Sequence, residues 1–96
     1  MDIKTNKLSN GAEPIEFIAR KRGGWLVIAR REEEYQAFVV WNIDVTPAKT
    51  VAGIVYHNCS LGSYCETLAE AVVCAYQRAG KLGELEEMVE REGRHA

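Results

Sequence analysis

The chain has 96 residues, of which 47% are hydrophobic and 27% are charged, and its formal net charge is −2 at pH 7. This composition is typical of one globular domain and excludes a disordered chain. The slight acidity argues against direct binding of nucleic acid, which usually requires a basic surface. The polar N-terminal segment lacks a secretion signal, and no apolar run reaches the roughly 18 residues of a membrane span. We therefore expect a cytoplasmic protein without membrane contact.

The N-terminal part of the chain changes from a polar segment to strand-like runs. We expect residues 1–12 to form a flexible leader and residues 13–96 to form a single α+β domain. Runs rich in β-branched and aromatic residues predict four strands, at about 14–22, 25–31, 35–43 and 50–57. Gly23 and Gly24 separate the first two runs. Because glycine tolerates positive φ, this pair predicts a two-residue hairpin turn.

The period of the apolar residues becomes helical after residue 66. Thr67 and Glu70 match a capping box, in which the Thr67 hydroxyl accepts a hydrogen bond from the Glu70 amide. Apolar residues at helical spacing predict a helix at 68–79, ended by Gly80, and a short C-terminal helix at 84–92. The whole pattern predicts an α+β fold, a four-stranded antiparallel β-meander with the first helix packed on one face.

The predicted turns also assign side chains to the two faces of the sheet. A two-residue turn places Arg20 opposite Val27, and the loop at Glu32–Glu34 places Trp25 opposite Trp41. The face that the first helix can cover then carries Phe17, Ala19, Leu26, Ile28, Phe38 and Val40. The other face is also apolar, and one helix cannot cover both. We expect either a partner on that face or the leader or second helix folded over it.

The face without a helix is the predicted binding surface. Aromatic residues and arginine are enriched in the cores of protein interfaces. The acidic tip formed by three consecutive glutamates adds charge that speeds association with a basic groove on a partner. The candidate partner-binding residues are Trp25, Trp41, Tyr35, Arg22, Arg31, Glu32, Glu33 and Glu34.

The stretch HNCSLGSYC at 57–65 holds one of the two histidines and two of the three cysteines. Zinc sites usually take their ligands from two closely spaced pairs, and a thiol nucleophile needs a base that a third group orients. Neither pattern is present, so we interpret the stretch as a connector between a strand and a helix, with cysteine as a small buried residue. No metal, cofactor or catalytic residue is predicted.

The functional hypothesis rests on the small size of the chain and on the lack of a P-loop, a Rossmann glycine pattern, an HExxH motif or a nucleophile elbow. It is a non-catalytic protein-binding module, in one form a phage or mobile-element inhibitor of a larger host complex, of the anti-CRISPR or another anti-defence type. The first alternative is an antitoxin-like or regulatory homodimer that uses the same face. The second is a thiol or metal enzyme built on His57, Cys59 and Cys65.

One short segment resembles a known family. Within GSYCETLAEAV, Thr67, Leu68, Glu70 and Ala71 resemble the start of the first helix of HicB-type antitoxins, which often reads as a glycine, a polar residue and then Thr-Leu-Glu-Glu-Ala. The proline-rich segment expected before that helix is replaced by VYHNCSLG. We carry over no function from this resemblance.

Overall fold

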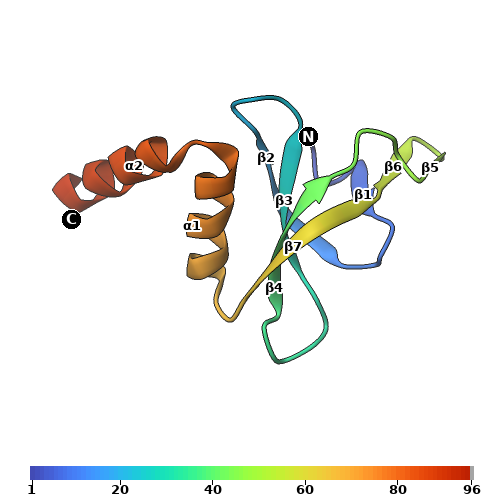
Figure 1. Ribbon diagram of the computed structural model, residues 1–96, viewed down its shortest axis with the longest axis horizontal. Helices are drawn as coiled ribbons and strands as arrows, with labels where there is room; N and C mark the ends of the chain where they lie inside the picture. Colours follow the sequence, from blue (N-terminus) through green and yellow to red (C-terminus); the bar gives the residue numbers. More distant parts are fainter. Residues whose placement is uncertain (96) are drawn as a thin grey trace.

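The computed structural model describes residues 1–95 (Figure 1). In chain order its elements are β1 Asn6–Leu8, β2 Glu13–Ala19, β3 Trp25–Arg30, β4 Phe38–Ile43, β5 Lys49–Val51, β6 Ile54–His57, β7 Cys59–Cys65, α1 Leu68–Ala79 and α2 Leu82–His95. The main sheet has the strand order β2-β3-β4-β7 and is antiparallel, while a smaller mixed sheet has the order β1-β6-β5. The predicted fold class, α+β with a four-stranded antiparallel sheet and C-terminal helices, is confirmed.

The fourth strand of the main sheet is β7, so the prediction that residues 50–57 fill this place is wrong. Strand β7 pairs with β4, whereas β5 and β6 form a hairpin in the small sheet. The interpretation of residues 59–65 as a connector is wrong for the same reason. Residues 50–57 contain more β-branched residues than residues 59–65, which include serine and glycine. Local preference therefore favours the first segment as a strand of the main sheet. Strand pairing depends on tertiary context, however, and the second segment takes this place.

The β2–β3 hairpin has a longer loop than predicted. Gly23 and Gly24 have the expected positive φ values of 101° and 80°, but the loop between the two strands spans residues 20–24. Phe17, instead of Arg20, therefore lies opposite Val27. From Glu16 to Ala19 this shift covers an odd number of residues, so the side chains of this part of β2 change face relative to the prediction; a bulge between Pro14 and Glu16 alters the register before it.

The β3–β4 pairing is also shifted, but by an even number of residues. Val27, rather than Trp25, lies opposite Trp41. An even shift leaves the side chains of both strands on the predicted faces. Two buried clusters result, one on each face of the main sheet. The helix-side core contains Ile18, Leu26, Ile28, Val40, Cys65, Ala71, Ala75 and Ala79, and the leader-side core contains Leu8, Phe17, Val27, Ala29, Val39 and Trp41.

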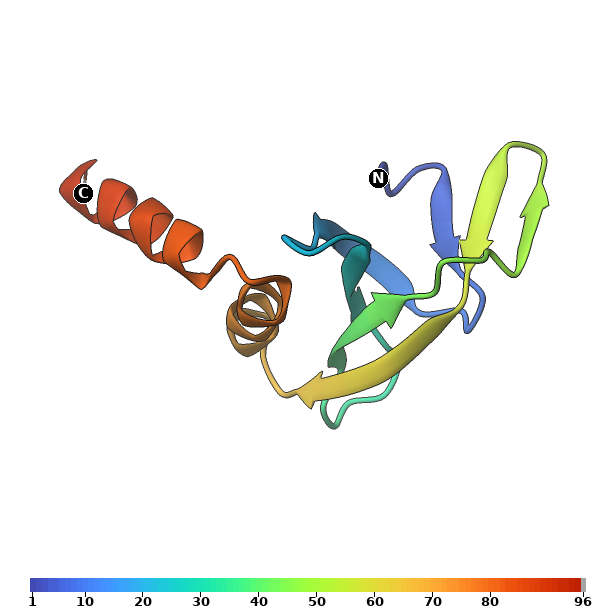
Figure 2. The same ribbon diagram turned by 45° about the horizontal axis from the view of Figure 1, so that its top comes forward.

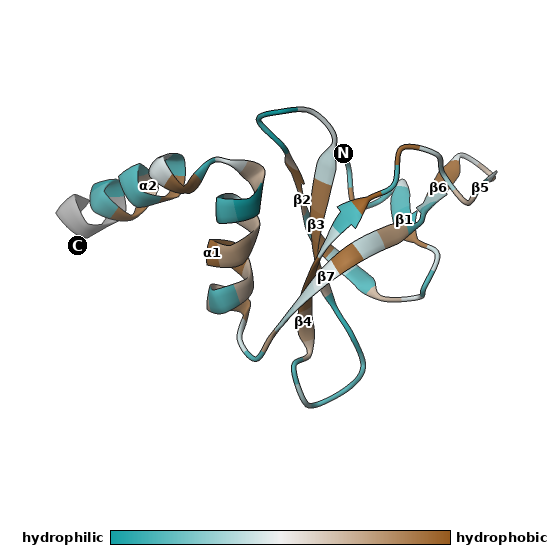
Figure 3. Ribbon diagram, viewed as in Figure 1, coloured by the Kyte–Doolittle hydropathy of each residue, from teal (hydrophilic) through white to brown (hydrophobic). Residues whose placement is uncertain are grey.

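Helix α1 covers the helix-side core and has the predicted bounds. The Thr67 hydroxyl accepts from the Glu70 amide at 3.1 Å, and Gly80 ends the helix in the left-handed conformation. Arg78 fastens the helix to the sheet, because its guanidinium donates to the Val40 carbonyl at 2.8 Å and to the Asn42 side chain at 2.9 Å. Hydrophobic residues are concentrated in the central strands between α1 and the small sheet (Figure 3).

Helix α2 contacts α1 and extends away from the sheet (Figure 2). It begins at Leu82, two residues before the predicted start at 84, and continues past the predicted end at 92. Leu82 and Leu85 are half-buried, while the side chains of Met88 and Val89 are exposed. The predicted second helix is confirmed, with longer bounds.

The N-terminal segment takes part in the fold. Strand β1, which lies within the expected leader, pairs parallel with β6, and the Ser9 amide donates to the His57 carbonyl at 2.9 Å. Leu8 is only 3% exposed and belongs to the leader-side core. The expectation of an uncovered sheet face therefore fails at this place, and the alternative in which the leader folds over the face is the arrangement observed.

Candidate functional site

The predicted binding residues separate into two groups. Trp25 and Arg22 lie at or next to the β2–β3 loop, whereas Arg31 and the glutamates follow the other end of β3. A strand of six residues spans roughly 20 Å, so the two groups do not share a contact region. Trp41 is 9% exposed and forms part of the leader-side core, so it cannot serve as a freely exposed anchor. Tyr35 is 71% exposed.

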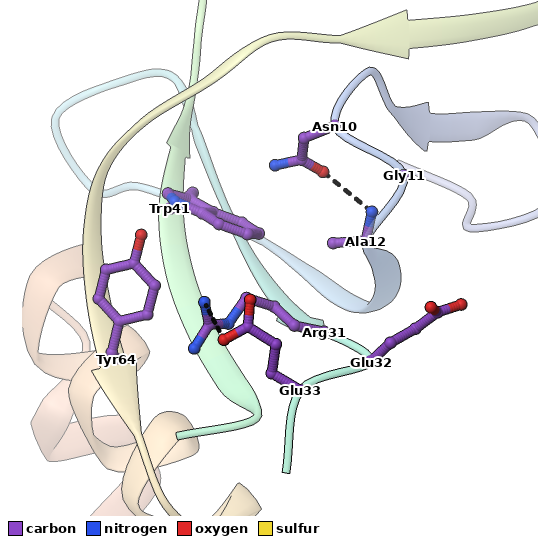
Figure 4. Close-up of a pocket in the computed structure, with 8 residues that line it drawn as sticks. All are labelled: Asn10, Gly11, Ala12, Arg31, Glu32, Glu33, Trp41 and Tyr64. Atoms are coloured by element: carbon purple, nitrogen blue, oxygen red, sulfur yellow. Dashed lines mark hydrogen bonds and ion pairs between the residues drawn. The ribbon is translucent and has the colours of Figure 1, made fainter. Parts of the chain in front are cut away.

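A pocket of about 590 Å³ is lined by three residues of the second group, Arg31, Glu32 and Glu33 (Figure 4). Its lining comes from residues 10–12 after β1, residues 31–33 after β3, Trp41 in β4 and Tyr64 in β7. A second hollow of about 530 Å³ lies against the loop at 31–36, which we call the acidic loop. This hollow shares Arg31, Glu32 and Glu33 with the first. The acidic loop is thus flanked by concave surface, and one of the two hollows has aromatic walls.

Arg31 organises the acidic loop. Its guanidinium donates to the carbonyls of Gln36 at 2.9 Å and Tyr35 at 3.3 Å, and it forms an ion pair with Glu33 at 3.3 Å. The guanidinium also lies over the Tyr64 ring, 4.7 Å from the centroid. Most of its donors are therefore used inside the protein, although the buried Nε has no partner among the described residues. Arg31 therefore mainly holds the loop in place, and little of its positive charge is available to a ligand.

The aromatic walls depend on a bulge in β7. The pairing with β4 shifts between Val40 and Asn42, which leaves Leu61 and Gly62 opposite Trp41. A Cβ atom on Gly62 would lie 2.7 Å from the Trp41 Nε1, so glycine is required for the indole to occupy this place. Trp41 and Tyr64 then meet edge to face, with centroids 6.5 Å apart and planes at 84°. The bulge re-aims side chains next to the pocket, as bulges commonly do.

The cysteines and His57 do not form a joint site. Cys59 and Cys65 lie at opposite ends of β7, and His57 belongs to the other sheet. Burial, followed by the nearby Asp44 carboxylate, raises the pKa of Cys59 to about 11, which disfavours the nucleophilic thiolate. Burial also raises the pKa of Cys65, with the nearby Cys74 as the next cause. Within the described part of the chain, no three potential metal ligands cluster.

His57 has a structural role in the small sheet. The side-chain Nδ2 of Asn6 donates to the Asp2 carbonyl at 2.9 Å, which directs the Asn6 Oδ1 toward His57. The His57 Nε2 therefore donates to this oxygen, at 2.8 Å. The ring also meets Phe17 edge to face at 6.3 Å. Burial lowers the pKa of His57, which favours the neutral ring over the charged one.

Sequence reasoning missed Tyr64 and the loop at residues 10–12. The sequence pattern predicts a connector at Tyr64 and a flexible leader at residues 10–12. A signal for Tyr64 is present in the sequence: the large Tyr64 lies between two small residues, Ser63 and Cys65. Such alternation is typical of a strand. The bulge at Leu61 and Gly62 interrupts the period of two, however, and hides the strand from pattern analysis.

Comparisons with protein-family models, with curated proteins and with solved structures found no match to this chain. Function must therefore be argued from the geometry of the pocket and its surroundings. Neither helix of the described chain has the length and apolar character that crossing a membrane would require.

Proposed function

We propose that the protein is a non-catalytic protein-binding module that contacts its partner through the acidic loop at 31–36 and the adjoining aromatic pocket. The main support is the combination of exposed aromatic rings with an ordered charged loop. Tyr35, within the loop, is 71% exposed, and Tyr64, in the adjoining pocket, is 48% exposed; Arg31 holds the loop in place. Aromatic residues and arginine dominate the binding energy of many protein interfaces.

The chemistry of the pocket also favours binding over catalysis. Its lining contains neither cysteine nor histidine, and its carboxylates, on Glu32 and Glu33, are exposed to solvent. A general acid or base usually needs an environment that moves its pKa toward the working pH. Solvent-exposed carboxylates on a loop are better suited to steering a basic partner toward the surface.

A specific form of this proposal is an inhibitor of a larger host complex, encoded by a phage or another mobile element. A small, mildly acidic domain with an acidic loop complements a basic groove, such as those of complexes that bind nucleic acid. This form predicts that the partner presents arginine or lysine residues to the loop.

The proposal is tested by affinity capture from the native host, followed by mass identification of the captured protein. We expect a bait with Tyr35→Ala and Tyr64→Ala to lose the partner while keeping the circular dichroism spectrum of the wild type. Val45→Ser is the matched control, because Val45 is 99% exposed in the loop between β4 and β5. Equal capture by the double variant and the wild type would refute the proposed surface.

A second candidate function, the antitoxin-like or regulatory homodimer, has a different observation in its favour. Helix α2 extends from the body and exposes Met88 at 45% and Val89 at 62%, next to the half-buried Leu85. An amphipathic helix with an unpaired apolar stripe commonly packs against another helix. Light scattering coupled to size exclusion would show a dimer that Met88→Lys and Val89→Lys dissociate; a monomer at all concentrations would remove this candidate.

A further inference from the structure

We propose that the pocket beside the acidic loop binds an arginine side chain of the partner protein. This inference rests on the proposed function and adds the chemistry of the recognised residue. Its starting point is the cavity of about 590 Å³, which is large enough for a long side chain and lies within the usual range of ligand pockets.

The walls of the pocket suit a flat cation. Trp41 and Tyr64 meet at 84° and thus form a corner of two aromatic rings. The Tyr64 ring already has one guanidinium against it, that of Arg31 at 4.7 Å from the centroid. An aromatic ring attracts a cation to its face through its quadrupole, and arginine is the most frequent partner in proteins. The internal contact shows that this environment accommodates a guanidinium.

The charges on the lining select a cation over an anion. Glu32 and Glu33 contribute two carboxylates, whereas Arg31 contributes one guanidinium. Both Nη atoms of Arg31 are already engaged, with Glu33, Tyr35 and Gln36. The Glu33 side chain remains 71% exposed, and Glu32 forms no ion pair with any described residue. An incoming cation thus meets exposed carboxylate oxygens, while an incoming anion would lie beside two carboxylates and a guanidinium that is already paired with one of them.

Arginine satisfies these conditions better than lysine. A guanidinium can lie flat against a ring and at the same time donate two parallel hydrogen bonds to a carboxylate, whereas an ammonium is a strongly hydrated point charge. The Asn10 side chain does not compete for the ligand, because its Oδ1 accepts from the Ala12 amide at 3.0 Å and holds the opposite wall (Figure 4).

The experiment is a titration followed by nuclear magnetic resonance of the tryptophan indole N–H groups. The Trp41 signal is assigned by comparison with a Trp25→Phe protein. The probe is the capped tripeptide acetyl-Gly-Arg-Gly-amide, and the same peptide with citrulline is its neutral isostere. At concentrations up to about 10 mM, which suit a single side-chain contact, the arginine peptide is expected to shift the Trp41 signal saturably. An equal response to citrulline, or no response to arginine, would overturn the inference.

Protein variants provide the second arm. Glu32→Gln leaves the Arg31–Glu33 ion pair intact and is expected to weaken peptide binding by about twofold to fivefold, the size of an exposed ion pair. Glu86→Gln on α2 has the same change of charge far from the pocket and is expected to leave the affinity unchanged. If Glu86→Gln weakens binding equally, the peptide senses only overall charge and the inference fails.

Partner capture separates this inference from the proposed function. If capture requires Tyr35 and Tyr64 but is indifferent to Glu32→Gln and to competition by the arginine peptide, the arginine inference is wrong and the proposed function stands. If capture is indifferent to the tyrosines as well, the proposed function is wrong too. If the tyrosine variants, Glu32→Gln and competition by the arginine peptide each abolish capture while Glu86→Gln does not, the result supports both the proposed function and the arginine inference.

Discussion

The two faces of the main sheet are covered in different ways. On the helix-side core, one continuous helix places Ala71, Ala75 and Ala79 against the strands, and all three are at most 2% exposed. On the leader-side core, a three-residue strand contributes Leu8, and the surrounding loops leave a pocket against Trp41. The cover on this side is assembled from separate segments, and the pocket is a gap where residues 10–12 and 31–33 meet β4 and β7. The candidate binding site lies at such a gap.

The largest expected effect distinguishes the two covers directly. Leu26 is fully buried in the helix-side core, and Leu26→Ala is expected to lower the free energy of unfolding by about 2–5 kcal/mol. Leu8→Ala is expected to cost about 2 kcal/mol, because a short strand can move into the space left by the side chain. Urea denaturation measures both.

Hydrogen exchange sharpens this pair of predictions. Leu8→Ala is expected to reduce amide protection in β1 and β6 while α1 keeps its protection, since the covers are separate local units. A loss of protection in α1 equal to that in β1 would show that the two covers are one cooperative unit.

A smaller effect is expected at the bulge that shapes the pocket. Gly62→Ala places a Cβ atom 2.7 Å from the Trp41 Nε1, so the indole must move, at a cost of about 1–3 kcal/mol. Gly83→Ala in α2 is the control, because nothing lies within 4 Å of its added Cβ and alanine favours the helix. Thermal unfolding with tryptophan fluorescence measures both; equal stability of Gly62→Ala and wild type would contradict the tight contact.

A comparable effect is expected where α1 is fastened to the sheet. Arg78→Met keeps most of the side-chain volume but removes the donors to the Val40 carbonyl, the Asn42 side chain and the Ser63 hydroxyl, at a cost of about 1–3 kcal/mol. Arg91→Met removes only an exposed pair with Glu87 and is expected to change stability by less than about 0.5 kcal/mol. Equal losses in the two variants in urea denaturation would contradict this role of Arg78.

The smallest expected effect is a pH dependence of the leader-side cover. Burial lowers the pKa of His57 in the folded protein, so the unfolded chain takes up a proton first as the pH falls below about 6.5. Stability is therefore complete above this pH and declines on acidification. Between pH 7 and pH 5, the unfolding free energy of the wild type is expected to decline more than that of His57→Gln. Parallel pH profiles of the two proteins would exclude this linkage.

The sequence was informative where local signals and packing agree. The capping residues Thr67 and Gly80 fixed the bounds of α1, and the positive φ of Gly23 and Gly24 was predicted correctly. The predicted faces of β3 and β4 were also right, because the error in their register was even. For the candidate site, sequence reasoning found Arg31, Glu32, Glu33 and Trp41 among the eight residues that line the pocket.

By itself, the sequence determined the fold class, the first helix and the alternation of side chains in the central strands, because these depend on neighbours within a few residues. Tertiary structure decided which strand completes the main sheet, how β2 aligns with β3 and what covers Trp41. These outcomes depend on pairing between segments far apart in the chain, such as Leu8 with His57 and Phe38 with Cys65. A serine- and glycine-containing strand forms there because pairing with β4 supplies backbone hydrogen bonds that its own residues do not predict.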